Sequence, residues 1–232
     1  MTVESMAGEF DQQASVIASR LHELPAVEQI AAACRGSGNP AALSWLAECL
    51  GLHRRSWVID LGAGIGGPAA WLTRRYGCQI VNLEPAPLAA RAANRLFGAP
   101  TICGAAERAP VKDDAFDVGL LLGVLSVVEN PGQVLREARR IASGIGVMEY
   151  CSTSPQDVVV GGSTFVPAEG LRCLIEQFGW RVVQEADVDV PSPRSWAEAT
   201  AKLEIEQEDS EIEVVHAIEA GRLAPVVMHA AR

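Results

Sequence analysis

The sequence predicts an α/β fold, a parallel sheet covered by helices on both faces. Two observations carry this prediction: strand-like and helix-like segments alternate from residue 56 to 150, and a glycine-rich turn directly follows the first apolar strand. Parallel strands need crossover connections, which the intervening helical segments provide. With 232 residues, 49% of them hydrophobic, the chain can bury one sizeable core, so a single α/β domain with a modest appendage is expected.

The first 55 residues predict a helical cap that precedes the sheet. Pro25 ends the first amphipathic helix, and a second helical piece follows through Val27 and Ile30 until the glycines at 36–38 break the pattern. A third helix begins at Asn39-Pro40 and ends at Gly51. The first helix rests on apolar residues at three- and four-residue steps, namely Phe10, Ala14, Ile17, Leu21 and Leu24. We therefore expect two units, a cap or lid at 1–55 and a catalytic-type domain at 56–232.

The alternating region contains five predicted strands and three predicted helices. The strands are expected at 57–61, 79–83, 100–103, 116–122 and 145–150, and the helices at 67–76, 87–97 and 131–141. Ligands of such sheets bind at the carboxyl ends of the strands. In this arrangement Asp60, Glu84, Gly104 and Gly123 meet at that edge.

Beyond residue 150 the pattern predicts a glycine-rich loop at 161–162, and then further helices and strands. A helix is expected at 167–178, a strand at 180–190, two short acidic helices near 195–198 and 210–213, and a last strand at 223–230. The segments 151–166 and 191–221 are expected to border the mouth of the cleft.

The turn after the first strand is compatible with two cofactors. Gly62, Gly64 and Gly67 satisfy the G-x-G-x-x-G spacing of dinucleotide folds, and Glu84 stands about 20 residues beyond Gly64, where a ribose-binding acid is expected. However, Asp60 lies two residues before Gly62, and an acid there repels a pyrophosphate but suits a cationic ammonium group. This favours S-adenosylmethionine, which carries an amine and a sulfonium and no phosphate.

With Asp60, the glycine turn, Glu84, the segment 104–110 and the acidic turn at 113–117, the chain resembles the class I S-adenosylmethionine-dependent methyltransferases. The similarity is to the small-molecule group that includes ubiquinone and menaquinone biosynthesis enzymes. It runs from about residue 56 to 150 and more weakly through 167–190. The resemblance implies a Rossmann-like, doubly wound sheet of seven strands in the order 3-2-1-4-5-7-6, with the N-terminal helices as a cap.

The resemblance also implies a set of cofactor-binding residues. In the family, the glycine turn lies against the methionine part of the cofactor, the acid after the second strand holds the ribose, and an Asp after the third strand binds adenine. Ala105 stands where that Asp is common, so the adenine roles pass to the backbone of Ala106 and to Glu107. The predicted set is Asp60, Gly62, Ala63, Gly64, Gly66, Glu84, Ala106, Glu107, Leu122 and Gly123.

Methyl transfer from a sulfonium is an in-line displacement, so the protein mainly has to align the reactants, and a nearby carboxylate can take the proton of the nucleophile. Glu149 and Glu129 follow strand ends and are the predicted catalytic residues, while Tyr150, Trp196 and His22 are the predicted substrate contacts. The six cysteines form no C-x-x-C pair, so we expect buried free thiols and no metal site.

The predicted function is therefore S-adenosylmethionine-dependent methylation of O, N or C of a small metabolite. Two alternatives remain open at this stage. A catalytically silent, cofactor-binding regulatory or scaffold subunit is favoured by Ala105 alone, and an NAD-linked oxidoreductase by the G-x-G-x-x-G spacing alone.

Composition limits the partners. A net charge of −10 and a pI near 4.9 argue against nucleic acid and anionic membranes, and the apolar run 118–128 is too short to span a bilayer. The N-terminal segment has acids where a signal peptide carries basic residues, so a soluble, cytoplasmic protein is expected. The expected partner is a small-molecule methyl acceptor; the oligomeric state stays open, with a homodimer as one alternative.

Overall fold

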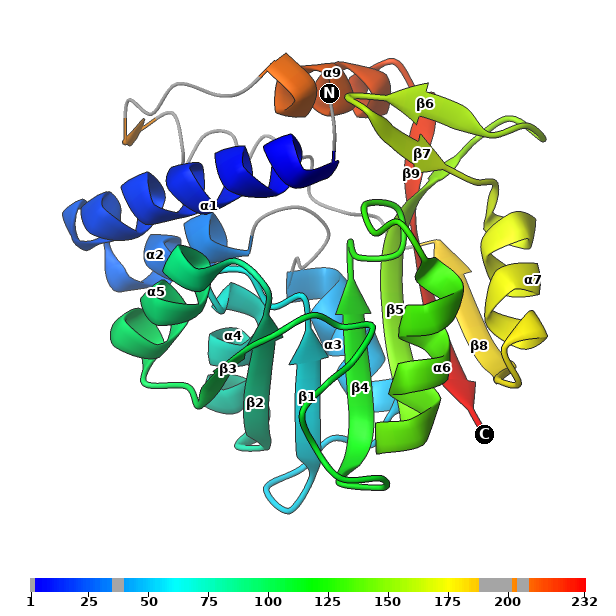
Figure 1. Ribbon diagram of the computed structural model, residues 1–232, viewed down its shortest axis with the longest axis horizontal. Helices are drawn as coiled ribbons and strands as arrows, with labels where there is room; N and C mark the ends of the chain where they lie inside the picture. The colour runs from blue at the N-terminus through cyan, green and yellow to red at the C-terminus, as the bar shows by residue number, and fades with distance from the viewer. Residues whose placement is uncertain (1–2, 35–39, 188–201, 204–208) are drawn as a thin grey trace.

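A seven-stranded sheet forms the centre of the computed structural model, which describes residues 3–34, 40–187, 202–203 and 209–232 (Figure 1). Its strands are β1 (Trp57–Leu61), β2 (Gln79–Glu84), β3 (Thr101–Cys103), β4 (Phe116–Leu122), β5 (Ala142–Ser152), β8 (Arg181–Asp187) and β9 (Leu223–Ala231). The order is β3-β2-β1-β4-β5-β9-β8, with β1 to β5 parallel and β9 antiparallel to both neighbours. Counted within this sheet, β8 is sixth and β9 seventh, so the predicted order 3-2-1-4-5-7-6 is confirmed.

Helices cover both faces of the sheet because successive residues of its buried strands point to opposite sides. Ile59 and Leu61 of β1 belong to a core shared with α6 (Pro131–Ile141) and α7 (Ala168–Gln177). Val58 points the other way, into a core shared with α3 (Pro40–Cys49) and α4 (Gly67–Tyr76). The strand and helix patterns predicted at 57–150 are thus confirmed, with ends that differ by up to three residues.

The N-terminal helices divide between two places. Of the segment predicted as a cap, α3 is a layer of the main core: Gly146 on β5 has no Cβ, and one built there would lie 2.9 Å from Leu50 and 3.2 Å from Leu46. By contrast, α1 (Val3–Arg20), α2 (Ala26–Ala33) and the short 3-10 helix η1 (Leu21–Glu23) lie beyond the carboxyl ends of the strands (Figure 1). They pack on α5 (Pro87–Phe97) in a separate apolar cluster that also includes Ile65.

One predicted loop is a hairpin. Residues 161–162 connect β6 (Val158–Val160) to β7 (Ser163–Phe165), an antiparallel pair outside the main sheet. Gly161 and Gly162 have φ of 56° and 80°, the left-handed conformation that a tight hairpin turn requires at both central residues. The signal was present in the sequence, because a Gly-Gly pair flanked by β-branched residues is typical of such hairpins.

The cysteines and the acidic helices differ in part from what the sequence predicts. Cys103 and Cys173 are exposed, so the six cysteines are free but not all buried. The acidic helix expected near 210–213 is α9 (Asp209–Glu219), whereas the one expected near 195–198 lies outside the described residues.

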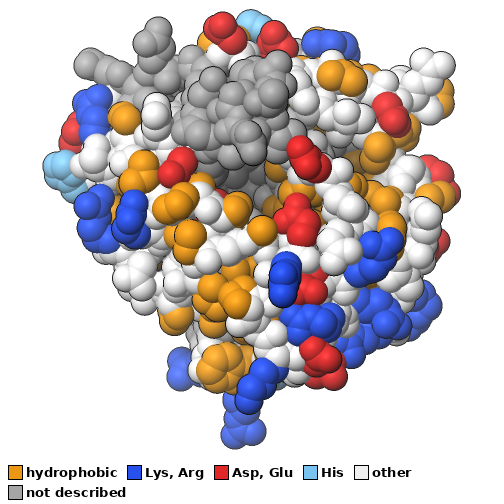
Figure 2. Space-filling model, in the orientation of Figure 1, with side chains coloured by type: hydrophobic (Ala, Val, Ile, Leu, Met, Phe, Trp, Pro, Cys, Tyr) orange, Lys and Arg blue, Asp and Glu red, His pale blue; other side chains and the backbone are white. Residues whose placement is uncertain are grey.

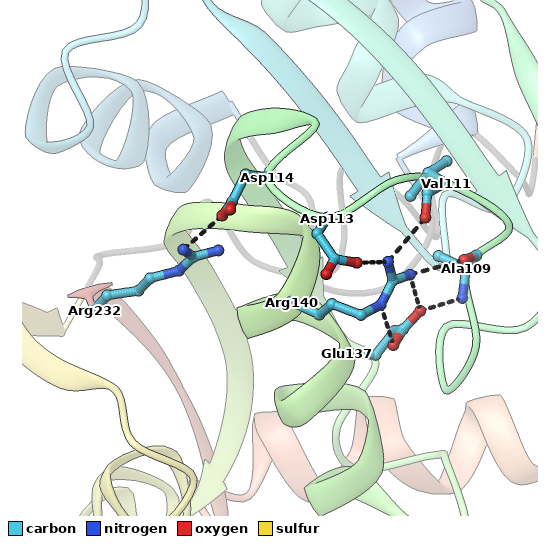
Figure 3. A network of polar contacts seen from close by, with 7 residues as sticks. All are labelled: Ala109, Val111, Asp113, Asp114, Glu137, Arg140 and Arg232. Atoms are coloured by element: carbon cyan, nitrogen blue, oxygen red, sulfur yellow. Dashed lines mark hydrogen bonds and ion pairs between the residues drawn. The ribbon is translucent and has the colours of Figure 1, made fainter.

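An ion-pair network anchors the long loop between β3 and β4 to α6 (Figure 3). Arg140 donates to Glu137 at 2.6 Å, to Asp113 at 2.6 Å, and to the carbonyls of Ala109 and Val111. Glu137 in turn accepts from the Ala109 N–H at 2.7 Å. Two side chains therefore satisfy several backbone groups of a loop that has no regular structure of its own.

We expect Arg140→Met to destabilise the protein by about 2–3 kcal/mol, because it leaves the buried Glu137 carboxylate without its cation and frees two loop carbonyls. Urea unfolding at neutral pH measures the change. The matched control is Arg232→Met: Arg232 pairs with the exposed Asp114 at 2.6 Å (Figure 3), and such a pair contributes less than about 1 kcal/mol.

The same pair of variants has a pH signature. Hydrogen bonding to Arg140 lowers the pKa of Glu137 below its ordinary value of 4.5, so the stabilisation is complete above that pH and is lost as the pH falls through the lowered pKa. The difference in stability between wild type and Arg140→Met should therefore be smaller in acid, well below pH 4.5, than at neutral pH. If the two proteins differ in free energy of unfolding by the same amount in acid and at neutral pH, the role assigned to Glu137 is wrong.

Candidate functional site

The turn between β1 and α4 depends on glycine conformations. Gly62, Gly64 and Gly66 have φ of 79°, 55° and 82°, which residues with a Cβ rarely adopt. Space is short as well: a Cβ on Gly62 would lie 2.7 Å from the side chain of Val124, in the loop after β4. The turn therefore packs directly against the end of the neighbouring strand β4.

The N–H groups of this turn are used within the protein. Those of Gly62 and Ala63 donate to the Leu83 carbonyl at 2.8 and 3.2 Å, and that of Gly64 donates to Glu84 Oε2 at 2.7 Å. A dinucleotide site needs such N–H groups free to bind a pyrophosphate. The N–H groups of Gly62, Ala63 and Gly64 are not free in this way.

The start of α4 is covered too. A Cβ on Gly67 would lie 2.3 Å from the carbonyl carbon of Ala33 and 2.4 Å from the nitrogen of Cys34, so the end of α2 lies against the first residue of α4. The helix terminus that would receive a phosphate in a dinucleotide fold is therefore occupied by the chain itself.

Two buried oxygen atoms beside the turn lack hydrogen-bond partners. They are Asp60 Oδ2 and Asn82 Oδ1, on residues that face each other in the β1–β2 register. Asp60 is 1% exposed, and burial together with the negative charge of Glu84 raises its pKa to about 7. Among the described residues, these are the buried side-chain oxygens left unsatisfied, so the site lacks a donor rather than an acceptor.

Glu84 ends β2 and is also buried. Its Oε2 accepts from Gly64 and its Oε1 accepts from the Ala86 N–H at 2.9 Å. Burial raises the pKa of Glu84, against the effect of these two hydrogen bonds, and the charge of Asp11 adds to the rise. Each carboxylate oxygen retains a lone pair, so Glu84 can still accept from a diol.

Asp11 of α1 is a site residue that sequence reasoning missed. Its Oδ1 accepts from the N–H groups of Leu88 and Ala89, at 2.8 and 3.0 Å, and so caps the first turn of α5. The residue before α5, Ala86, has no side chain able to do this. That missing cap was the available signal, but the sequence does not show where the substitute comes from.

The remaining predicted cofactor residues meet at the same edge of the sheet. Ala106 is buried, and the carbonyl of Glu107 accepts from the Gln133 side chain at 3.3 Å. Gly123 follows the buried Leu122 with φ of 73° and donates its N–H to the Met148 carbonyl at 2.8 Å. These residues follow β3 and β4, whose carboxyl ends lie beside those of β1 and β2 (Figure 1).

Glu149 holds the loop after β4. It is 3% exposed; its Oε1 accepts from the Leu125 N–H at 2.7 Å and its Oε2 from the Ser126 hydroxyl at 2.9 Å. Burial raises the pKa of Glu149 to about 7 despite these hydrogen bonds. The contacts give it a role in positioning the loop, while the catalytic role predicted for it stays a prediction.

A pocket of about 320 Å³ lies beside that loop, between β5, the β6–β7 hairpin and α7. Three predicted residues, Glu129, Glu149 and Tyr150, line it together. Figure 2 shows apolar side chains gathered at this place, on the upper right, and Lys and Arg side chains lower on the same side, over α6.

Two predicted substrate contacts do not join this group. His22 is exposed on η1, where its Nδ1 lies 2.9 Å from the Ser19 carbonyl. η1 directly follows α1, whose end lies on the side of the molecule away from α7 and the β6–β7 hairpin (Figure 1). The structure therefore gives His22 no place beside Glu129 and Tyr150. Trp196 lies outside the described residues.

Residues 59–148 match the family model described as a methyltransferase domain. This segment is a class I methyltransferase domain. The methyltransferase domain spans the predicted cofactor residues from Asp60 to Gly123, and the resemblance drawn from the sequence is confirmed. S-adenosylmethionine is the cofactor of this class of domain.

Known proteins extend the comparison. A sarcosine/dimethylglycine N-methyltransferase from Halorhodospira halochloris is 34% identical over 109 residues, which are 43% of this chain and 38% of that protein. The chain thus spans well under half the length of this relative.

Two solved structures share the fold. The [4+2]-cyclase SpnF aligns with a TM-score of 0.74 and 19% identity over 100% of this chain and 97% of its own. Geranyl diphosphate C-methyltransferase from Streptomyces coelicolor A3(2) aligns with a TM-score of 0.65 and 14% identity, over 83% and 78% of the two chains. Identities this low establish the common fold and leave the reaction open.

Glu149 should make stability depend on pH. Because its pKa in the folded protein, about 7, exceeds the ordinary value of 4.5, the folded state binds more protons between these pH values and stability falls as the pH rises. We expect Glu149→Gln to remove about 2–3 kcal/mol of this fall, measured by urea unfolding at a series of pH values from about 5 to 8. Glu129→Gln, at an exposed position of the same pocket, is the control; an equal effect in both variants would contradict the assignment.

Proposed function

We propose that the protein is an S-adenosylmethionine-dependent methyltransferase that acts on O, N or C of a small metabolite. The observation that carries this proposal is the pair of buried, unpartnered oxygens on Asp60 and Asn82, beside a turn in which the N–H groups of Gly62, Ala63 and Gly64 are bonded within the protein. An ammonium group supplies three donors and a positive charge, and it needs no N–H donors from the turn. A cofactor with an ammonium group and no phosphate fits this site, and a dinucleotide does not.

The residues present fit the parts of this cofactor. Asp60 would balance the ammonium group, the backbone of Gly62 to Gly66 would lie against the methionine part, and Glu84 would hold the ribose hydroxyls. Ala106 and Glu107 would border the adenine, and Leu122 and Gly123 complete the same edge. No described Lys or Arg pairs with Asp60 or Glu84, so the positive charge has to come from the ligand.

When bound, S-adenosylmethionine supplies an electrophilic methyl group. The task of the chain is then to align the acceptor with it and to exclude water, and such positioning reaches effective concentrations of about 10⁵ M or more. The packing of α1 and α2 on Ile65 and α5 encloses the cofactor side of the site. Glu129 is exposed on the pocket wall, and its carboxylate would accept a proton from the acceptor.

A second candidate is a cofactor-binding protein that transfers no methyl group, acting as a regulatory or scaffold subunit or in another reaction. Ala105, where an adenine-binding Asp is common, supports it, and the likeness to a [4+2]-cyclase over the whole chain shows that the fold alone does not select methyl transfer. The third alternative, an NAD-linked oxidoreductase, conflicts with the internally bonded turn.

The proposal extends to the partners of the protein and to its location. The described residues include no helix both long enough and apolar enough to cross a membrane. We further propose a small-molecule acceptor and a cytoplasmic location. We propose no nucleic-acid partner, on the basis of the net charge of −10. A homodimer remains a hypothesis for sedimentation measurements.

Calorimetric titration tests the cofactor assignment. Wild type should bind S-adenosylmethionine, and Asp60→Asn should weaken binding about 10- to 100-fold because it removes the charge that balances the ammonium group. Asp117→Asn is the matched control, since Asp117 accepts from the Trp57 N–H at the opposite end of β1. Tight binding of NADH, with none of S-adenosylmethionine, would overturn the proposal.

The titration should also depend on pH. With the pKa of Asp60 at about 7 in the free protein, the carboxylate form that binds the cation grows as the pH rises, so affinity should increase between about pH 5.5 and 7.5. In Asp60→Asn this increase should be largely lost. A cofactor affinity that does not change with pH in the wild type would contradict the role of Asp60.

A further inference from the structure

We propose that the pocket beside the loop after β4 binds the methyl acceptor, and that the acceptor is a neutral, largely apolar molecule with a hydroxyl or carbonyl group. The inference rests on the proposed methyl transfer and names the class of its substrate. It is drawn from the size, lining and charge of the pocket and from its connection to the glycine turn.

Size and lining indicate a compact apolar ligand. The volume of about 320 Å³ lies at the lower end of the range for small-molecule sites, roughly 300–1,000 Å³. Leu125, Val128, Val166 and Leu174 supply apolar walls from three different elements, and the ring of Tyr150 adds an aromatic one. Walls of this kind bind a ring or a short hydrocarbon by removing its surface from water.

Charge excludes anionic acceptors. The pocket is lined by no Lys, Arg or His among the described residues, and its charged groups are the carboxyls of Glu129 and Glu149. A phosphate or carboxylate placed there would lose its hydration and meet acidic groups only, which is unfavourable in a partly buried site. A neutral ligand avoids both costs.

Polar groups are available to orient the ligand. Ser163 and Thr164 line the pocket from the β6–β7 hairpin, and the hydroxyl of neither makes a hydrogen bond to another described residue. A hydroxyl both donates and accepts, so it can bind an alcohol or a carbonyl equally well. A few such groups in an apolar pocket are typical of sites that fix the orientation of a ligand.

The loop after β4 joins the pocket to the cofactor edge of the sheet. Val124 packs against the backbone of Gly62, and the next residue, Leu125, lines the pocket and donates its N–H to Glu149. One short loop therefore touches the proposed cofactor turn on one side and the pocket on the other. An acceptor in the pocket and a cofactor at the turn would share this loop.

Fluorescence titration with N-phenyl-1-naphthylamine, a neutral dye that brightens in apolar sites, tests the pocket without requiring methyl transfer. The protein should bind the dye, and 2-naphthol should displace it at about tenfold lower concentration than 2-naphthoate, which has the same rings and a carboxylate. Equal displacement by the two compounds would overturn the inference.

Two variants locate the binding site. Leu174→Trp on α7 and Val128→Trp in the loop after β4 each add bulk to the pocket lining, and each should weaken dye binding about tenfold. Val183→Trp, at a 43% exposed position of β8, is the control and should leave dye binding unchanged. Thermal unfolding identifies a variant that fails to fold. The other variant then shows whether the dye binds in the pocket.

The outcomes separate this inference from the proposed function. Binding of S-adenosylmethionine without dye binding, or dye binding retained in a folded pocket variant, overturns the neutral-acceptor pocket and leaves the cofactor assignment standing. Dye binding sensitive to both variants, in a protein that does not bind S-adenosylmethionine, supports the pocket and overturns the methyltransferase proposal.

Discussion

The hydrogen bond from the Gly64 N–H to the Glu84 carboxylate joins the ends of β1 and β2, and the site is built around it. It uses an N–H group that a phosphate-binding turn would leave free, and it holds the Glu84 carboxylate in the interior close to Asp60. Two buried acids without a basic partner are costly in the free protein, and the raised pKa of each expresses that cost. A cationic ligand lowers this cost. The arrangement that destabilises the free protein therefore favours the binding of a cation.

Close packing connects the glycine turn to the loop after β4 and to the pocket. Gly62 leaves room for Val124, and the next residues in the loop, Leu125 and Ser126, donate hydrogen bonds to the Glu149 carboxylate. Neither the loop nor Glu149 can shift without affecting the turn or the pocket wall. The N-terminal helices add a second connection through Asp11, which caps α5 from a segment more than seventy residues earlier.

Local signals explain which elements were predictable. Pro87 and Pro131 begin their helices, and Gly77 and Gly98 follow the ends of α4 and α5 in left-handed conformation, so these boundaries follow from residue type alone. The hairpin at 158–165 has an equally local signal in Gly161-Gly162, although the same glycines also fit the loop expected there. The roles of Asp11 and Glu149 had none, because their partners are distant in the sequence.

The sequence by itself determined the fold class, the strand order implied by its family resemblance and the edge of the sheet where the cofactor residues meet, because periodicity, prolines and glycines act within a few residues of themselves. Through Asp60 and the family resemblance it also favoured S-adenosylmethionine over the dinucleotide that the G-x-G-x-x-G spacing alone allows. Only the tertiary structure decided what the turn N–H groups bind, which buried oxygens lack partners and which walls enclose the pocket. Those properties depend on contacts between segments far apart in the chain, and no local pattern specifies them.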